Sequence, residues 1–183
     1  MIPYKNEKIQ NAIAFFAKKH LQKTKKSLCQ TYLYKYLGFF DFLSLRETGR
    51  PAIGLVYKAM KRGPVPIEIY HDKKDTPLYK FKKDEKGEFI INTNKKPNMD
   101  FFSPYEIELM ERLIEIYATR WMTTDIISDC SHEDILAWKR TWAKKPNSII
   151  DYTLEFVGDL PFKSENELTY QEEVYLTYKA IAS

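Results

Sequence analysis

Apolar residues recur every three or four positions over residues 6–21 and again over residues 24–43, the spacing of one face of an α-helix. Thr24 is expected to cap the second helix, because its hydroxyl can accept a hydrogen bond from a free amide of the first turn. The second segment is apolar over much of its circumference. We therefore expect it to lie at the centre of the fold.

The rest of the chain predicts one small β-hairpin among further helices. Residues 78–91 alternate around a polar turn that contains Gly87, which is typical of a hairpin. A helix over residues 103–121 begins with a capping box of Ser103 and Glu106. The predicted fold is therefore α+β and mainly α: a single compact helical domain over residues 1–183. The remaining helices are expected over residues 66–72, 123–130, 131–143 (capped by Ser131), 148–157, and 169–182 (with a box of Thr169 and Glu172).

Residues 63–66, Gly-Pro-Val-Pro, interrupt this helical pattern. Gly63 can adopt a positive φ and end the preceding segment, which reads as a short helix or an extended stretch. Pro64 and Pro66 keep the residues before them out of the helical region. The stretch is thus predicted to form a sharp, rigid corner.

Composition and charge narrow the class of protein. The 183 residues are 44% hydrophobic, and 29 basic residues against 25 acidic ones give a net charge of +4. This surplus is mild for a nucleic-acid binder. No apolar run approaches the roughly 18 residues of a membrane span. Cys29 and Cys130 are expected to be reduced thiols of a cytoplasmic chain, with one disulfide in a secreted domain as the alternative.

Candidate chemistry is sparse. Pro64 and Pro66 remove amides that a phosphate-binding loop would need, so no phosphate cofactor is expected. Of the three histidines, His132 alone lies near a cysteine, Cys130, and two ligands do not make a metal site. The same pair lacks an oxyanion hole and a third member for nucleophilic catalysis. We expect Cys130 to be a small buried residue, His132 to fix the local turn, and the protein not to be an enzyme, although a hydrolase using His132 stays open.

Two kinds of partner remain. Residues 123–145 can be written as a helix-turn-helix for DNA, with Lys139, Arg140 and Lys144 near its end, but its second helix is broadly apolar. The other is a protein. The segment 32–42 holds more aromatic side chains than one helix face can bury, and those left at the surface would favour a protein interface. They are Tyr32, Tyr34, Tyr36, Phe39, Phe40 and Phe42.

Two motifs carry a family resemblance. The stretch GRPAIGLVYKAMKRGPVPIEIY resembles the signature of the Panacea domain, the SocA-like antitoxin family of phage-associated type. The later stretch IISDCSHEDILAWKRT resembles the family's Ser/Thr-His motif followed by a tryptophan. The similarity spans about residues 24–145 and leaves a helical C-terminal extension, 146–183. The matching positions are Gly49, Arg50, Pro51, Ala59, Gly63, Pro64, Val65, Tyr70, Ser131, His132 and Trp138, whereas Met60 stands where a tryptophan is frequent.

The resemblance implies a toxin–antitoxin function. Members are cytoplasmic proteins that neutralise a toxin encoded in the adjacent gene by direct protein–protein interaction, and one member delivers its toxin to a protease. No cofactor, metal or catalytic centre is implied. The corner would be a rigid hub of the binding surface, with Tyr70, His132 and Trp138 as its scaffold. The alternative is a DNA-binding transcriptional regulator that uses residues 123–145.

Overall fold

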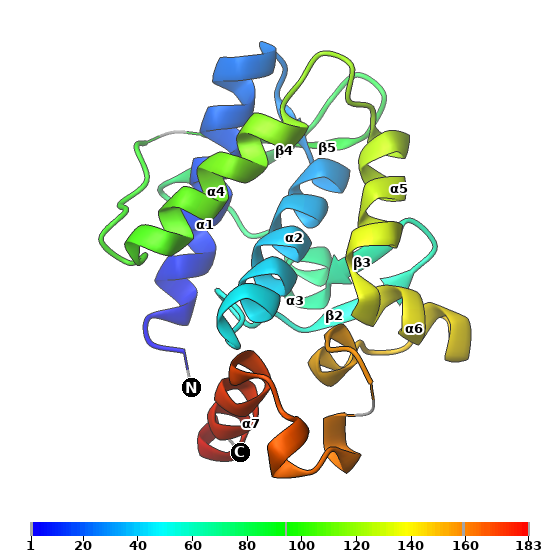
Figure 1. The fold of residues 1–183 in the computed structure, drawn as a ribbon. Coiled ribbons are helices and arrows are strands. Elements are labelled where there is room, and N and C mark those ends of the chain that lie inside the picture. Colours follow the sequence, from blue (N-terminus) through cyan, green and yellow to red (C-terminus); the bar gives the residue numbers. More distant parts are fainter. Residues whose placement is uncertain (1, 94, 159, 183) are drawn as a thin grey trace.

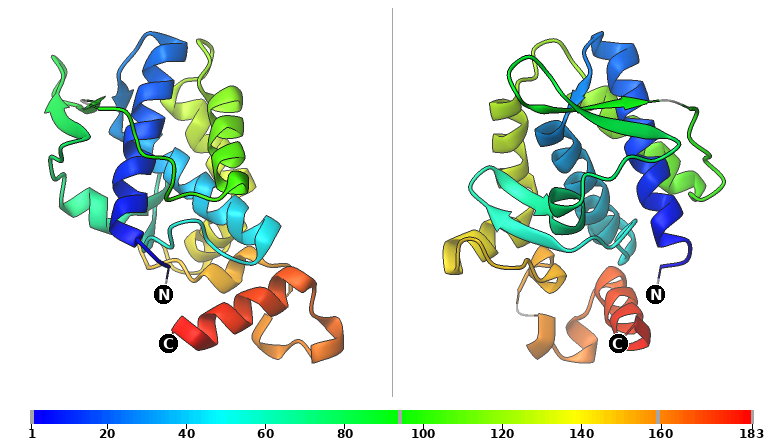
Figure 2. Two further views of the ribbon diagram at one scale, coloured as in Figure 1. Left: turned by 90° about the vertical axis from the view of Figure 1, so that its left-hand side faces the viewer. Right: turned by 180° about the vertical axis from the view of Figure 1, so that it is seen from behind.

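A computed structural model describes residues 2–93, 95–158 and 160–182. The long helices are α1 (Lys5–Thr24), α2 (Gln30–Thr48), α4 (Pro104–Tyr117), α5 (Thr124–Asp134), α6 (Leu136–Lys144) and α7 (Tyr170–Ala182). Helix α2 passes through the centre, with α1 and α4 on one side and α5 on the other (Figure 1). The two β-hairpins lie on the side of α2 that faces away from α4, which is the side nearest the viewer in the right-hand view of Figure 2. The predicted α+β, mainly α fold is confirmed.

The expected hairpin is present, and a second one joins it. Strands β4 (Tyr79–Lys83) and β5 (Phe89–Thr93) pair antiparallel, and β1 (Leu28–Cys29) adds to the free edge of β5. The second hairpin pairs β2 (Tyr57–Met60) with β3 (Gly63–Pro66), so the proline-rich corner is itself a strand. Helix α3 (Ile67–His71) follows directly. Neighbouring prolines hide this strand from pattern analysis, because each removes a ladder donor.

Burial explains the central place of α2. Every one of the aromatic residues noted between positions 32 and 42 is less than a tenth exposed. Phe16 of α1 stacks on Tyr36, and Tyr117 of α4 stacks on Phe39, with ring centroids 4.9 and 4.6 Å apart. None of these aromatics is therefore left at the surface to form the protein interface considered from the sequence. Helices α1 and α4, helix α5 and the β-hairpins all contact α2. Its aromatic residues are therefore buried on several faces of the helix and not on one face only.

Helix ends agree with the sequence where the signal is local. The capping box of Ser103 and Glu106 forms at the start of α4, and Thr169 and Glu172 make the same exchange at the start of α7. Thr24 was wrongly expected to be a cap. It ends α1 instead, where its hydroxyl donates to the carbonyl of His20. Helix α2 begins only at Gln30, because Leu28 and Cys29 pair as a strand.

Two further boundaries differ from the prediction. Helix α5 continues through Ser131, which is buried and donates to the carbonyl of Ser128 rather than capping a new helix. The break falls at Ile135, a residue with no breaking chemistry, whose side chain is fully buried. The helix predicted over residues 148–157 is wrong as well. Residues 147–150 run along the edge of β2, and a 3-10 turn, Tyr152–Glu155, follows.

The short C-terminal elements complete the chain. Two more 3-10 turns, Leu160–Phe162 and Glu165–Glu167, lead into α7, which packs below the end of α2 (Figure 1). Both cysteines are free thiols, so the alternative of a disulfide is excluded. Among the described residues, no helix is long and apolar enough to cross a membrane.

Candidate functional site

The β2–β3 corner joins an exposed turn, Lys61 and Arg62, to the buried strand β3, which begins at Gly63. The φ of Gly63 is +106°, as the sequence requires of a glycine at this point. A Cβ added there would lie 2.2 Å from Nζ of Lys35 and 2.5 Å from Oγ of Ser131. Helix α2 also lies close to the corner, because a Cβ on Gly38 would lie 3.1 Å from the ring of Pro64. The corner is therefore packed tightly between α2 and α5, and Gly63 leaves no room for a side chain.

Lys35, which lies beside the corner, was not among the candidate residues named from the sequence. It is 1% exposed, and its ammonium group donates to the backbone carbonyl of Arg62, in the turn before Gly63. Burial, helped by the nearby charge of Arg62, lowers the pKa of Lys35 to about 7. The available signal was a lysine inside a helix that is apolar nearly all round, since such a residue must be buried.

The His132 motif joins the same place from α5 and α6. The imidazole of His132 stacks on the indole of Trp138, with centroids 4.0 Å apart and planes at 10°. Nε1 of Trp138 donates to the carbonyl of Met60 at 3.0 Å, which ties α6 to the β2–β3 turn. Burial, followed by the Lys35 charge, lowers the pKa of His132. His132 thus holds helices together, whereas the predicted hydrogen bond fixing its own turn is not formed at Nε2, which is buried without a partner.

The structure brings most of the predicted motif residues together. Gly63, Pro64 and Val65 form the corner, and Ser131, His132 and Trp138 close around it. Tyr70 lies at the rim, 38% exposed, with its ring 6.4 Å from that of Tyr34. Tyr70 is therefore part of the surface beside the corner rather than of the buried scaffold.

A pocket of about 200 Å³ opens between the corner and the first turns of α2. Tyr34 and Lys35 contribute to its buried part, and Lys61, Arg62 and Tyr70 are exposed around it. The hydroxyl of Tyr34 is buried and has no hydrogen-bond partner within the described residues, and the same holds for Oε1 of Gln30. Buried polar groups are nearly always paired, so these two unpaired atoms distinguish the pocket.

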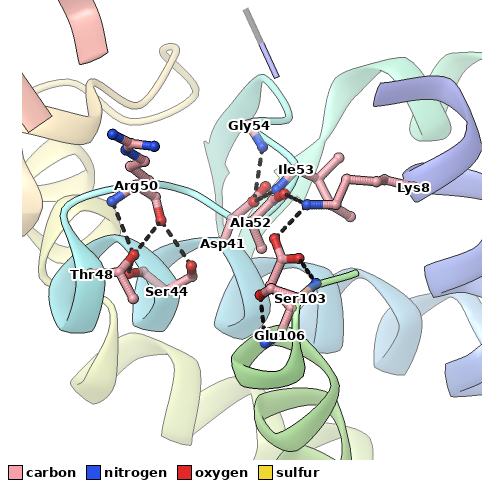
Figure 3. A network of polar contacts seen from close by, with 10 residues as sticks. All are labelled: Lys8, Asp41, Ser44, Thr48, Arg50, Ala52, Ile53, Gly54, Ser103 and Glu106. Carbon is pink, nitrogen blue, oxygen red and sulfur yellow. Dashed lines mark hydrogen bonds and ion pairs between the residues drawn. The ribbon is translucent and has the colours of Figure 1, made fainter. Parts of the chain in front are cut away.

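The Gly-Arg-Pro motif lies at the opposite end of α2 and has a structural task (Figure 3). Gly49 ends α2 with φ +77°. The carbonyl of Arg50 accepts from the hydroxyls of Ser44 and Thr48, which fastens the turn to the helix. Lys8 of α1 donates to the carbonyl of Ala52 and pairs with the capping carboxylate of α4, Glu106. The motif thus joins α1, α2 and α4.

Asp41 anchors the chain that leaves this turn. Its carboxyl group accepts from the backbone amides of Ile53, Gly54 and Leu55 at 2.6–3.1 Å, and the first two contacts are drawn in Figure 3. The hydroxyls of Tyr57 and Tyr152 lie 3.0 and 3.3 Å from Oδ2. Complete burial raises the pKa of Asp41, while the amide hydrogen bonds oppose this. Residues 53–55 form no helix or strand, so the Asp41 carboxyl group supplies the acceptors that their backbone amides would otherwise lack.

Catalytic and metal sites find little support in this geometry. Burial raises the pKa of Cys130, which is the wrong direction for a nucleophilic thiol. Oδ1 of Asp129 lies 3.9 Å from Nδ1 of His132, and the Asp129 side chain is largely exposed. This distance is too long for the hydrogen bond that would orient a catalytic histidine. In the part of the chain that the structure describes, no three His, Cys, Asp or Glu residues are grouped to hold a metal ion.

The helix-turn-helix candidate is α5 followed by α6, and two of its basic residues, Lys139 and Arg140, are engaged within the protein. Arg140 donates to the backbone carbonyls of Leu154 and Phe156, and Lys139 pairs with Glu133. Ala137, Trp138 and Thr141 bury one side of α6. Because Arg140 serves the fold, it is not available as a phosphate contact.

Comparisons with known proteins place the chain in a family. Neither curated proteins nor solved structures give a match. The family model described as antitoxin SocA-like, Panacea domain, matches residues 33–139, more than half of the chain. This range contains the corner, Lys35, the Gly-Arg-Pro turn and the His132–Trp138 stack. The chain therefore belongs to the SocA-like antitoxin family, whose shared unit is the Panacea domain.

Proposed function

We propose that this protein is an antitoxin that neutralises a cognate toxin protein by binding it directly. The observation that carries the proposal is the family match over residues 33–139, which encloses the whole corner site. The toxin is expected to be encoded in the adjacent gene and to meet the antitoxin in the cytoplasm. We further propose that the protein acts without a catalytic centre, and that delivery of the toxin to a protease is a second route of neutralisation.

The geometry supports a division between a buried frame and an exposed rim. Residues 63–66 are buried and packed between helices, so they set the shape of the surface. Lys61, Arg62 and Tyr70 are exposed beside them, where another protein can reach them, although Arg62 is paired with Asp125. Tyrosine and arginine are among the side chains that contribute most to protein interfaces. We propose this rim as the toxin-binding surface.

Growth of cells tests the proposal. The neighbouring open reading frame is expressed with and without this protein, and arrest by the neighbour alone with rescue by the pair is expected. Lys61→Glu should weaken rescue, since it reverses a charge on the rim. The matched control is Lys82→Glu, which reverses an exposed charge on β4, away from the rim. A neighbouring gene product that does not arrest growth would contradict the proposed function. Equal rescue by the two variants would contradict the proposed binding surface.

A further inference from the structure

The pocket beside the corner holds two buried polar atoms without a partner, which a free protein rarely keeps without a ligand. Tyr34 is 4% exposed and its hydroxyl has no partner within the described residues. Oε1 of Gln30, one helical turn earlier in α2, is also buried and unpartnered. An unpaired buried polar group destabilises the folded state, so the presence of two together needs a reason.

Charge indicates the kind of ligand. Lys35, Lys61 and Arg62 line the pocket, and none of the described residues that line it carries a carboxylate. Arg62 is partly neutralised, because its guanidinium pairs with Asp125 of α5 at the protein surface. Gln30 begins α2, so the positive end of the helix dipole also faces this region. The pocket therefore favours an anionic group.

Shape and hydrogen bonding narrow the ligand further. A volume of about 200 Å³ admits a side chain rather than a nucleotide or a large cofactor. Met60 and Val65 give the pocket apolar wall. A hydroxyl and an ammonium group can both donate to one carboxylate, and the Gln30 amide can present its NH₂ group to it. An acidic side chain, with methylenes behind a carboxylate, offers the complementary chemistry.

We infer that this pocket binds the side-chain carboxylate of a glutamate or aspartate presented by the partner toxin. The inference rests on the proposed function for the identity of the partner. One carboxylate oxygen accepts from the Tyr34 hydroxyl, and the Gln30 amide and the Lys35 ammonium hold the other. Lys61 adds charge at the rim. The Tyr34 hydroxyl, which has no partner in the free protein, is then paired in the complex.

A peptide titration tests the pocket without the toxin. The probes are acetyl-Gly-Glu-Gly-amide and its neutral counterpart, acetyl-Gly-Gln-Gly-amide, followed by the backbone amide resonances of the ¹⁵N-labelled full chain. We expect the glutamate peptide to shift Thr31, Lys61 and Arg62 saturably, with a dissociation constant in the millimolar range. The glutamine peptide should bind several-fold more weakly. Equal binding of the two peptides, or no saturable shift with glutamate, overturns the inference.

Two variants make the test specific. Tyr34→Phe removes only a hydroxyl that has no partner in the free protein, so the fold should be kept while glutamate binding weakens several-fold. Lys61→Ala changes an exposed residue and should weaken binding in the same sense. The control Lys82→Ala should bind as the wild type does. Undiminished binding by Tyr34→Phe contradicts the inference.

The outcomes separate this inference from the proposed function. If the protein rescues growth but the glutamate peptide does not bind, the pocket assignment fails and the antitoxin function stands. If the peptide binds at the pocket and no toxin is neutralised, the carboxylate site stands and the proposed function fails.

Discussion

The imidazole ring of His132 lies parallel to the indole ring of Trp138, with their centroids 4.0 Å apart. This contact joins the last turn of α5 to α6 across the break at Ile135. Because Trp138 also donates to the carbonyl of Met60, the pair fixes both helices to the corner. The family motif is thus a packing device at the edge of the proposed binding surface.

Replacement of His132 separates packing from chemistry. His132→Phe keeps a flat ring on Trp138 and removes the unpartnered Nε2, so stability should be kept. His132→Ala removes the stack and should lower the free energy of unfolding by about 1–2 kcal/mol. Urea denaturation measures both. Loss of toxin neutralisation by a stably folded His132→Phe would instead assign the imidazole a chemical role.

Gly63→Ala should be among the most damaging changes at the corner. The new Cβ meets the buried Lys35 Nζ and Ser131 Oγ, and the positive φ disfavours any L side chain. We expect a loss of about 3 kcal/mol or more. Gly87→Ala is the matched control: its φ is +80° but no atom lies within 4 Å of the added Cβ, so about 1 kcal/mol is expected. Equal costs in thermal or urea unfolding would refute the close packing of the corner.

Acid should destabilise the protein through His20. The residue is buried beside the Tyr36 hydroxyl, and burial lowers its pKa from 6.5 to about 4. The unfolded chain therefore binds the proton more readily, and stability falls as the pH drops from 6.5 towards 4. At pH 5 the cost is about 2 kcal/mol.

Comparison of the wild type with His20→Gln isolates this effect, because glutamine can hydrogen-bond to Tyr36 but does not titrate. Glu155 acts in the opposite direction, since burial raises its pKa to about 7, and it is common to both proteins. Unfolding free energies are measured from pH 7 to pH 5. A difference between the two proteins that stays constant with pH would show that His20 does not titrate in this window.

Charge reversal tests the DNA-binding alternative. Lys139→Glu together with Lys144→Glu avoids Arg140, which holds backbone carbonyls and would unfold the region if changed. We expect toxin neutralisation to be unaffected. DNA binding through these lysines would weaken steeply as the salt concentration rises. We expect fluorescence anisotropy with duplex DNA to detect no such binding by the wild type. Such binding, abolished by the double variant, would favour a DNA-binding regulator.

Local signals explain what the sequence could predict. The box at Ser103 and Glu106 involves residues three positions apart, so no distant contact is needed to form it. The positive φ at Gly63 likewise depends on the residue itself, because a glycine has no Cβ to disfavour it. The mainly helical fold was predictable because long stretches of the chain keep one helical period.

Tertiary contacts decided the remainder. The β2–β3 hairpin forms because α2 and residues 147–150 flank it, and nothing within residues 57–66 indicates this. Ile135 ends α5 because the core takes its side chain. The pocket combines α2 with the corner, so Gln30 and Tyr34 could not be recognised before the fold placed them together.

Calorimetric titration of the purified toxin, the product of the neighbouring open reading frame, into this purified protein tests the central claim most directly. The account predicts a saturable complex with a dissociation constant in the micromolar range or below, weakened by Lys61→Glu and unchanged by Lys82→Glu. A toxin that arrests growth yet gives no saturable binding to the folded wild-type protein would contradict the account.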